Sequence, residues 1–191
     1  ENLHKKEKLE HMNQILSDLY VRDSVTGLYN RMGYQKLSIS YFTIMREKKM
    51  PVLVMFIDLD RLKYINDTFG HEYGDFAIVS IAKAMLKHCD ADAIAARTGG
   101  DEFIVLEGAK DEESGRVLAQ KIRTELSKTQ RAMQLPFDLS ASIGAVVAHP
   151  GEENVLESYV KRAEMLMYEE KAEKKVSRDC LLYTSDAADD L

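Results

Sequence analysis

Apolar and polar positions along the chain follow two different periods, and together they predict a mixed α and β domain. A continuous apolar run at 52–59 follows Pro51 and ends in Asp58-Leu59-Asp60. A short, β-rich run of this kind is typical of a strand buried on both faces. In the segment 139–148, small polar residues alternate with apolar ones, which predicts a second strand.

The remaining patterns in the middle of the chain predict helices and one hairpin. Apolar side chains recur at helical spacing in 31–48, 76–88, 111–128 and 155–175. Two short apolar runs, at 93–96 and 103–106, flank Gly99 and Gly100. They predict a hairpin with a two-residue turn, because glycine adopts φ > 0 at little steric cost. The order is of βαββαβ type, so we expect an α+β fold with a mainly antiparallel central sheet and helices on one face.

The two ends of the chain differ from the middle. An apolar stripe at heptad spacing runs through residues 1–22, at Leu9, Met12, Leu16 and Leu19. It fits either a short coiled coil, the end of a dimeric signalling helix, or one amphipathic helix packed on its own domain. We take 23–178 as the folded domain. Residues 179–191 have no clear period, so we expect a disordered or artefactual tail.

Composition narrows the classes of function. The chain has 191 residues, of which 45% are hydrophobic, and a net charge of −6. This suits one domain with a short appendage and argues against a broad nucleic-acid-binding surface. The two cysteines lack metal-ligand spacing, and no signal peptide or apolar run of membrane-spanning length is present. We expect a cytoplasmic fragment without membrane contact. We also expect that a sensor region is missing upstream, and the full-length protein could carry a membrane anchor there.

Carboxylates at two strand ends are the first candidates for chemistry. Asp58 ends the buried run, where a charge is costly unless it is paired or bound to a metal. Asp101 and Glu102 follow the two glycines, and neighbouring strand residues point to opposite faces. Carboxylates beside an accessible backbone suit a hard divalent cation that carries a phosphate. The alternative is an ordinary hairpin with an acidic edge.

The segment 61–75 is dense in side chains that form directional hydrogen bonds. Asn66 offers an amide donor and acceptor, and the Asp75 carboxylate can accept two N–H groups. This pair matches a guanine edge, where the carboxylate takes N1–H and N2–H and the amide reads O6 or N7. The alternative is a polar loop in which both residues are caps, and the pattern alone favours a cap at Asp75 because a helix follows directly.

Charged residues in two further segments have both a structural and a binding interpretation. Lys171 and Lys175 are four residues apart and share a helix face, near a helix end where they could reach a phosphate. The pattern alone favours solvated lysines. Residues 23–31 form a polar turn, and Asp23 and Arg31 are candidates for an ion pair across it.

Four blocks in a fixed order carry a resemblance to a known family. They are Asp-Ser-Val-Thr-Gly-Leu-Tyr-Asn-Arg at 23–31, Phe-Ile-Asp-Leu-Asp at 56–60, Lys-Tyr-Ile-Asn-Asp-Thr-Phe-Gly-His-Glu-Tyr-Gly-Asp at 63–75 and Gly-Gly-Asp-Glu-Phe at 99–103. Over about 23–175 the chain resembles the GGDEF family, the diguanylate cyclases. The resemblance implies a fold like that of nucleotidyl cyclases and polymerase palms. It also implies the condensation of two GTP into cyclic di-GMP and two pyrophosphates by a homodimer with one GTP per protomer.

The resemblance implies a role for each matching residue. Asp58, the Leu59 carbonyl and Asp101 are implied to bind Mg²⁺ or Mn²⁺, with Glu102 beside the metal and the phosphates. Asp101 and Glu102 are the implied catalytic residues, with Asp101 or a neighbouring water as proton acceptor. Asn66 and Asp75 are implied to read guanine. The full implied substrate-binding set is Lys63, Asn66, His71, Asp75, Gly99, Gly100, Lys171 and Lys175.

The chain departs from the family pattern at two sites. Many members carry an inhibitory product site, Arg-x-x-Asp, whose positions here are Asp90 and Ala93, so the resemblance implies that this site is absent. The last helix usually ends Lys-x-x-Gly-Arg-Asn, which here reads Lys171-Ala-Glu-Lys-Lys175-Val. Two other functions stay open: a non-catalytic module that binds GTP or another nucleotide and regulates a partner, and a polymerase-like palm. The net charge of −6 argues against the palm.

Overall fold

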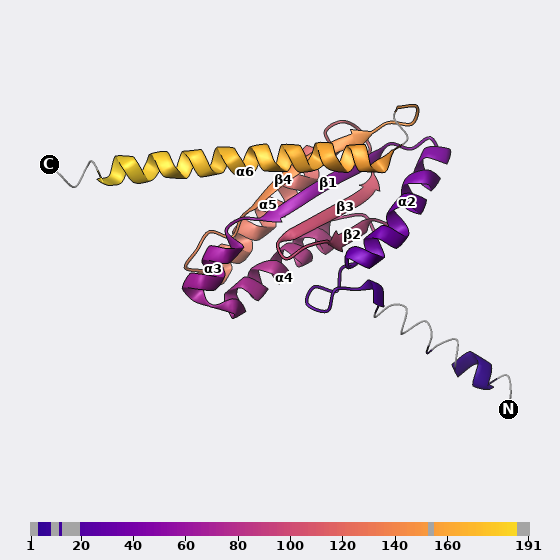
Figure 1. Ribbon diagram of the computed structural model, residues 1–191, viewed down its shortest axis with the longest axis horizontal. Helices are drawn as coiled ribbons and strands as arrows, with labels where there is room; N and C mark the ends of the chain where they lie inside the picture. Colours follow the sequence, from indigo (N-terminus) through magenta and orange to yellow (C-terminus); the bar gives the residue numbers. More distant parts are fainter. Residues whose placement is uncertain (1–3, 9–11, 13–19, 153–154, 187–191) are drawn as a thin grey trace.

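The chain follows the predicted order of strands and helices, with one further helix in the polar segment after the first strand (Figure 1). The computed structural model describes residues 4–8, 12, 20–152 and 155–186. Its elements are α2 (Arg31–Glu47), β1 (Val52–Leu59), α3 (Leu62–Phe69), α4 (His71–His88), β2 (Ile94–Arg97), β3 (Glu102–Gly108), α5 (Ser114–Ala132), β4 (Ala141–Ala148) and α6 (Leu156–Asp186).

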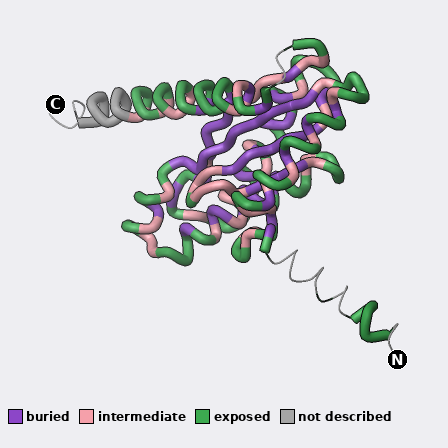
Figure 2. The backbone as a smooth tube through the Cα atoms, turned by 45° about the vertical axis from the view of Figure 1, so that its right-hand side comes forward, coloured by how far each residue is buried: buried purple, intermediate pink, exposed green. Residues whose placement is uncertain are grey.

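The four strands form one antiparallel sheet in the order β2-β3-β1-β4. Strand β1 lies between β3 and β4, and all eight of its residues are buried. The apolar run at 52–59 is therefore the predicted central strand, and the expected α+β fold with an antiparallel sheet is confirmed. Figure 2 shows the buried strands running through the middle of the molecule.

Helices cover both faces of the sheet, whereas we expected them on one face. Side chains of β1 alternate between a core with α4 and α5 and a second core with α2 and α6. Met55 and Ile57 belong to the first core, and Val54 and Phe56 belong to the second. Because neighbouring strand residues point to opposite faces, a strand that is apolar at every position needs cover on both.

A glycine in β4 allows α6 to lie close against the sheet. A Cβ atom at Gly144 would stand 1.9 Å from the Ala163 carbonyl oxygen and 2.4 Å from the Met167 backbone nitrogen. Both atoms are helix backbone, which cannot move aside as a flexible side chain would. The absent side chain thus fixes α6 across β4, and the helix reaches the ends of β1 and β4 (Figure 1).

The segment 61–75, expected as a polar loop before a helix at 76–88, is itself helical. Helix α3 occupies its first half, and α4 begins at His71. Only Ile65 of α3 is buried, so the apolar period of this eight-residue helix is too short to be recognised in the sequence. Gly70, at φ +98°, makes the bend between the two helices in a conformation that other residues rarely adopt.

The hairpin connection also differs from the prediction. Residues 98–101 join β2 to β3, in place of a two-residue turn, and neither Gly99 nor Gly100 has a positive φ. The Thr98 N–H donates to the Glu102 carbonyl oxygen at 3.0 Å and closes the loop. A Cβ atom at Gly99 would stand 2.6 Å from Glu102 Oε2, the mobile end of a flexible side chain, so neither space nor backbone angle requires glycine there.

The ends of the chain are described in part. Met12 is exposed, and the other heptad positions, Leu9, Leu16 and Leu19, lie outside the described residues. Helix α6 continues to Asp186, into the stretch for which we expected no regular structure, and residues 187–191 lie outside the description. Within the described ranges, no helix is both long and apolar enough to cross a bilayer.

Candidate functional site

Strand pairing brings the predicted carboxylates together at one end of the sheet. In the antiparallel register Asp58 is opposite Glu102 of β3 on one side and Ser142 of β4 on the other. The Leu59 N–H donates to the Asp101 carbonyl oxygen at 2.8 Å, which fastens the hairpin loop to the end of β1. Asp58 is buried, while Asp101 and Glu102 are partly exposed.

The Asp58 carboxylate faces α6, where Lys171 meets it. Lys171 Nζ donates to Asp58 Oδ1 at 2.6 Å. Burial raises the pKa of the Asp58 carboxyl, and the carboxylates of Asp101 and Asp60 add to the rise, which the hydrogen bond from Lys171 only partly offsets. Asp58 is therefore a carboxylate in an unfavourable site that a nearby cation stabilises.

Asp60, two residues further on, is buried in a different environment. It accepts hydrogen bonds from Ser142 at 2.6 Å, from Ser140 at 2.8 Å and from Lys174 at 2.9 Å. Burial would raise the pKa of this carboxyl, but the hydrogen bonds from Ser142 and Lys174 outweigh it and hold the pKa below its ordinary value. Asp60 is thus a fully paired structural carboxylate that joins β1, β4 and α6.

We expect Asp60→Ala to lower the free energy of unfolding by about 3 kcal/mol, because it leaves buried hydroxyls and an ammonium without their acceptor. The pKa of Asp60 is lowered from 3.8 in the folded chain. The carboxylate therefore stabilises the fold above that pH, and its contribution is lost as the pH falls through the lower folded pKa.

Urea denaturation between pH 3 and 7 measures this effect. The stability of the wild-type chain should fall with acid more steeply than that of Asp60→Asn. Asp67→Asn, at an exposed position of α3, is the matched control and should resemble the wild type. Equal acid dependence of the wild type and Asp60→Asn would contradict the role given to this carboxylate.

The block predicted to read guanine lies on α3 and the start of α4. Asn66 is half-buried on α3, and its Oδ1 is buried without a hydrogen-bond partner among the described residues. A Cβ atom at Gly74 of α4 would stand 1.9 Å from this oxygen, so the missing side chain makes room for the amide. His71 and Asp75 are exposed in the first turns of α4. This oxygen is enclosed against α4, so the groups of the block that are open to a ligand are the exposed His71 and Asp75.

The start of α3 offers backbone donors beside the carboxylates. Arg61 has a left-handed conformation with φ 61°, which turns the chain sharply from the end of β1 into the helix. The first N–H groups of a helix have no intrahelical acceptor and favour an anion. Lys63, in this first turn, is exposed. This end of α3 can therefore hold phosphate oxygens next to Asp58.

Sequence reasoning missed three charged residues near the site. Arg97 NH2 donates to the Gly100 carbonyl oxygen at 2.8 Å, and Arg97 NH1 lies 3.3 Å from Asp23 Oδ2. Asp23 thus pairs with Arg97, not with Arg31 as considered from the sequence, because strand β2 carries Arg97 to the turn. Lys174 and Glu170 of α6 also join the network around Asp60. Arg97 stands beside the glycine motif, and that position was the only signal available.

The predicted residues thus divide into two groups. The first group lies together at the end of the sheet through hydrogen bonds and strand register, and its members are Asp58, Leu59, Asp101, Glu102 and Lys171. The second group is exposed. Lys175 lies one helical turn beyond Lys171, and Gly100 lies in the hairpin loop.

The oxygen donors at the strand ends suit a hard divalent cation that takes only a few of its ligands from the protein. Across the described ranges, no three His, Cys, Asp or Glu side chains form a ready-made metal cluster. Two carboxylates, Asp58 and Asp101, and the backbone of Leu59 are oxygen donors. Mg²⁺ is commonly bound by one or two carboxylates together with water and substrate phosphates, so these residues fit it.

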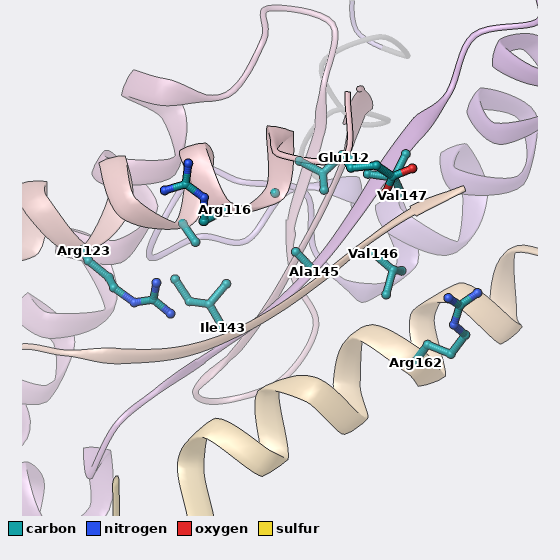
Figure 3. A pocket seen from close by; sticks show the side chains of 11 residues that line it. Glu112, Arg116, Arg123, Ile143, Ala145, Val146, Val147 and Arg162 are labelled. Carbon is teal, nitrogen blue, oxygen red and sulfur yellow. The ribbon is translucent and has the colours of Figure 1, made fainter. Parts of the chain in front are cut away.

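A cavity of about 430 Å³ lies elsewhere, beside the free edge of β4 (Figure 3). Arg116 and Arg123 of α5 and Arg162 of α6 line it around Ile143 and Ala145. None of the predicted site residues lines this cavity. The candidate site is the strand-end cluster, because its carboxylates, lysine and unpaired amide carry chemistry that the cavity lacks.

Comparisons with known proteins show to which family the chain belongs. A family model described as "Diguanylate cyclase, GGDEF domain" matches residues 20–177. The chain is 34% identical over 153 residues to the diguanylate cyclase VdcA of Vibrio cholerae, covering 78% of this chain and 43% of the relative. It is 27% identical over 165 residues to the cyclic di-GMP phosphodiesterase NbdA of Pseudomonas aeruginosa, covering 86% of this chain and 21% of the relative. The chain therefore spans less than half the length of either relative.

Solved structures show the same fold. The GGDEF domain of YfiN from Pseudomonas aeruginosa matches with a TM-score of 0.68 and 29% identity, over 80% of this chain and 89% of that one. The coiled coil and GGDEF domain of DgcB from Caulobacter crescentus, solved with c-di-GMP, matches with a TM-score of 0.74 and 22% identity, over 90% of this chain and 91% of that one. Together with the family match over most of the chain, this likeness means that the chain belongs to the GGDEF family of diguanylate cyclases.

Proposed function

We propose that this chain is an active diguanylate cyclase, which condenses two GTP into cyclic di-GMP with release of two pyrophosphates. The observation that carries the proposal is the cluster of Asp58, Asp101 and Lys171 at one end of the sheet, next to the free N-terminus of α3. At the level of the family, the match and the named relatives support cyclic di-GMP synthesis. A module that only senses nucleotide does not need two carboxylates beside a phosphate-binding helix end.

In the proposed reaction, a few oxygen atoms of this chain would bind the metal ion. Asp58, the Leu59 carbonyl and Asp101 would hold Mg²⁺ or Mn²⁺, with Glu102 beside it. When bound, the cation supplies charge neutralisation on the triphosphate and lowers the pKa of the attacking hydroxyl. The phosphates would be held by the N-terminus of α3 and by three lysines, Lys63, Lys171 and Lys175. Of these, Lys171 already lies at the carboxylate cluster.

Asn66 and Asp75 would select the base, with His71 in the same block. The Asp75 carboxylate accepts N1–H and N2–H of guanine, and the Asn66 amide hydrogen-bonds to the base edge. The support for a ligand here comes from Asp75 and His71, which are exposed in the first turns of α4.

In the proposed reaction, the 3′-hydroxyl of one GTP attacks the α-phosphorus of the other. A new P–O bond forms, the bond to the pyrophosphate oxygen breaks, and pyrophosphate leaves. Asp101, or a water beside it, accepts the hydroxyl proton. The reaction then repeats with the roles of the two nucleotides exchanged and closes the ring.

One GTP per protomer requires two protomers with facing half-sites. Short isolated helices are marginal in water. The two protomers of this chain therefore have only a weak means of dimerising through the heptad stripe, which consists of Leu9, Met12, Leu16 and Leu19. We therefore expect specific activity to rise with protein concentration.

Incubation with GTP and Mg²⁺, at protein concentrations spanning about a hundredfold range, tests this pairing by mass action. The separated nucleotides should include cyclic di-GMP, and its amount per protein should increase with concentration. Flat specific activity, with a monomer in sedimentation throughout, would contradict the facing half-sites.

The second candidate function is a non-catalytic module that binds GTP or another nucleotide and regulates a partner. Relatives named as cyclic di-GMP phosphodiesterases, NbdA among them, keep it open, since they match 76–86% of this chain. Bound GTP that stays unchanged at every protein concentration would favour this module over the cyclase.

A further inference from the structure

Lys174 of α6 makes four polar contacts that tie the helix to the ends of two strands. Its Nζ lies 2.7 Å from the Ala141 carbonyl oxygen, 2.9 Å from Asp60 Oδ2 and 3.3 Å from Ser142 Oγ. It also pairs with Glu170 Oε1, one turn back on the helix, at 2.8 Å. The ammonium thus reaches β1 and β4 at once.

The acceptors of Lys174 are themselves held in place. Asp60 is nearly fully buried and accepts the hydroxyls of Ser140 and Ser142. Glu170 pairs with Arg123 of α5 at 2.7 Å, so a chain of charges runs from α5 through α6 to the end of β1. A polar network in which every member is paired is rigid and specifies one geometry.

Lys171 lies three residues before Lys174, on a neighbouring part of the same helix surface. Its ammonium donates to Asp58 Oδ1, and its side chain is 40% exposed. Lys174 is nearly as exposed, at 34%, but it contacts four oxygen atoms on three segments, so it ties down this part of α6 more firmly than the single contact of Lys171 does. The position of Lys171 at Asp58 therefore depends on how α6 is anchored.

We propose that Lys174 is a positioning residue for phosphate binding: it locks α6 onto Asp60 and Ala141 so that Lys171 stands at the carboxylate cluster. This inference rests on the proposed function, since Lys171 is the residue given to the substrate phosphates. Lys174 itself, turned toward Asp60 and the β4 backbone, is not a phosphate ligand.

A purely structural lysine would stabilise the fold without affecting which part of the nucleotide is bound. A positioning residue acts through Lys171, so its loss should weaken binding of the triphosphate and spare the nucleoside. It should also have no further effect once Lys171 has been removed, because two residues that act as one unit are not additive.

The experiment compares binding of 3′-deoxy-GTP, which cannot cyclise, with binding of guanosine, both with Mg²⁺. Calorimetry measures the first and NMR titration the second. Lys174→Met should weaken 3′-deoxy-GTP binding about tenfold and leave guanosine binding unchanged. Lys174→Arg keeps a cation that reaches the same oxygens and should restore most of the affinity. Lys161→Met, at an exposed position of α6, is the matched control and should behave as the wild type.

The double variant Lys171→Met with Lys174→Met gives the decisive comparison. It should bind 3′-deoxy-GTP as weakly as Lys171→Met alone. The inference would be overturned if the two losses multiply in the double variant, or if Lys174→Met weakens guanosine binding as much as 3′-deoxy-GTP binding. It would also be overturned if Lys174→Met binds 3′-deoxy-GTP as the wild type does. If Lys174→Met fails to fold, Glu170→Gln, which removes the negative charge of one partner of Lys174, should give a smaller loss confined to the triphosphate, and an equal loss for guanosine would count against the inference.

The outcomes separate this inference from the proposed function. A wild-type chain that does not bind 3′-deoxy-GTP would overturn both. A wild-type chain that binds it, with Lys174→Met indistinguishable, would overturn the inference alone and leave the cyclase proposal intact.

Discussion

Replacement of Asp58 by asparagine should reduce cyclic di-GMP synthesis at least about a thousandfold, because a neutral amide is a poor ligand for Mg²⁺ and the lost charge stabilisation amounts to several kcal/mol. The same change should leave the chain folded. Asp58 lies at the end of β1 with its pKa raised by burial and by the carboxylates of Asp101 and Asp60. Its charge is therefore a cost to the fold.

Removal of that charge relieves this cost but also takes away the partner that raises the pKa of the Lys171 ammonium, so we expect the melting temperature to change by no more than about 3 °C. Thermal unfolding by circular dichroism and a GTP turnover assay, made on the same preparation, measure both effects. Asp92→Asn, at an exposed position before β2, is the control and should leave both unchanged. An active Asp58→Asn variant would contradict the metal assignment, and an inactive but unfolded one would contradict the account of the Asp58 charge.

The second large effect concerns the base. The chain should use GTP at least about a hundredfold better than ATP, because ATP leaves the hydrogen bonds of Asp75 and Asn66 unmade and each is worth about 1–3 kcal/mol. Adenine lacks the N1–H that Asp75 accepts and carries an amino group at position 6. Turnover of each nucleotide, measured as kcat/KM, gives the ratio, and comparable values would contradict the role of Asn66 and Asp75.

Gly74→Ala tests the same site without removing a hydrogen-bonding group. The new methyl would collide with Asn66 Oδ1, at 1.9 Å, so the amide must move. We expect the preference for GTP to fall sharply, although alanine favours the helix that contains it. Ala82→Gly, a buried position of α4 away from the block, separates a general effect on the helix from a local one. An unchanged preference in Gly74→Ala would show that the amide does not read the base.

Strand β1 could be predicted to the residue, and the reason is local. Its apolar run is continuous, Pro51 precedes it, and charged residues follow Leu59. The apolar side chains at every position could also have indicated cover on both faces, since a half-exposed strand alternates. Our expectation of helices on one face came from the element order, which does not state where each helix packs.

Helix α3 was missed because its apolar period is short. Ile65 is buried, and Leu62 and Phe69, at helical spacing from it, pack against the same core. The glycines of the hairpin were interpreted as a tight turn, yet the loop uses four residues and ordinary backbone angles. In both places, packing against another segment decided the local conformation.

The site was predictable as a set of residues and less so as a network. The resemblance identified Asp58, Asp101 and Lys171, but not that Lys171 pairs with Asp58. Lys174 had no signal at all, since lysines spaced along a helix are usually solvated. Its role depends on where the ends of β1 and β4 meet α6, which only the fold determines.

The central claim is that this site joins two GTP molecules. The most direct test is a time course in which cyclic di-GMP and pyrophosphate are measured together, with the wild-type chain at high concentration, GTP and Mg²⁺. We predict two pyrophosphates for each cyclic di-GMP, and neither product from Asp58→Asn. Release of phosphate with formation of GDP, or GTP that binds and stays unchanged, would contradict the claim.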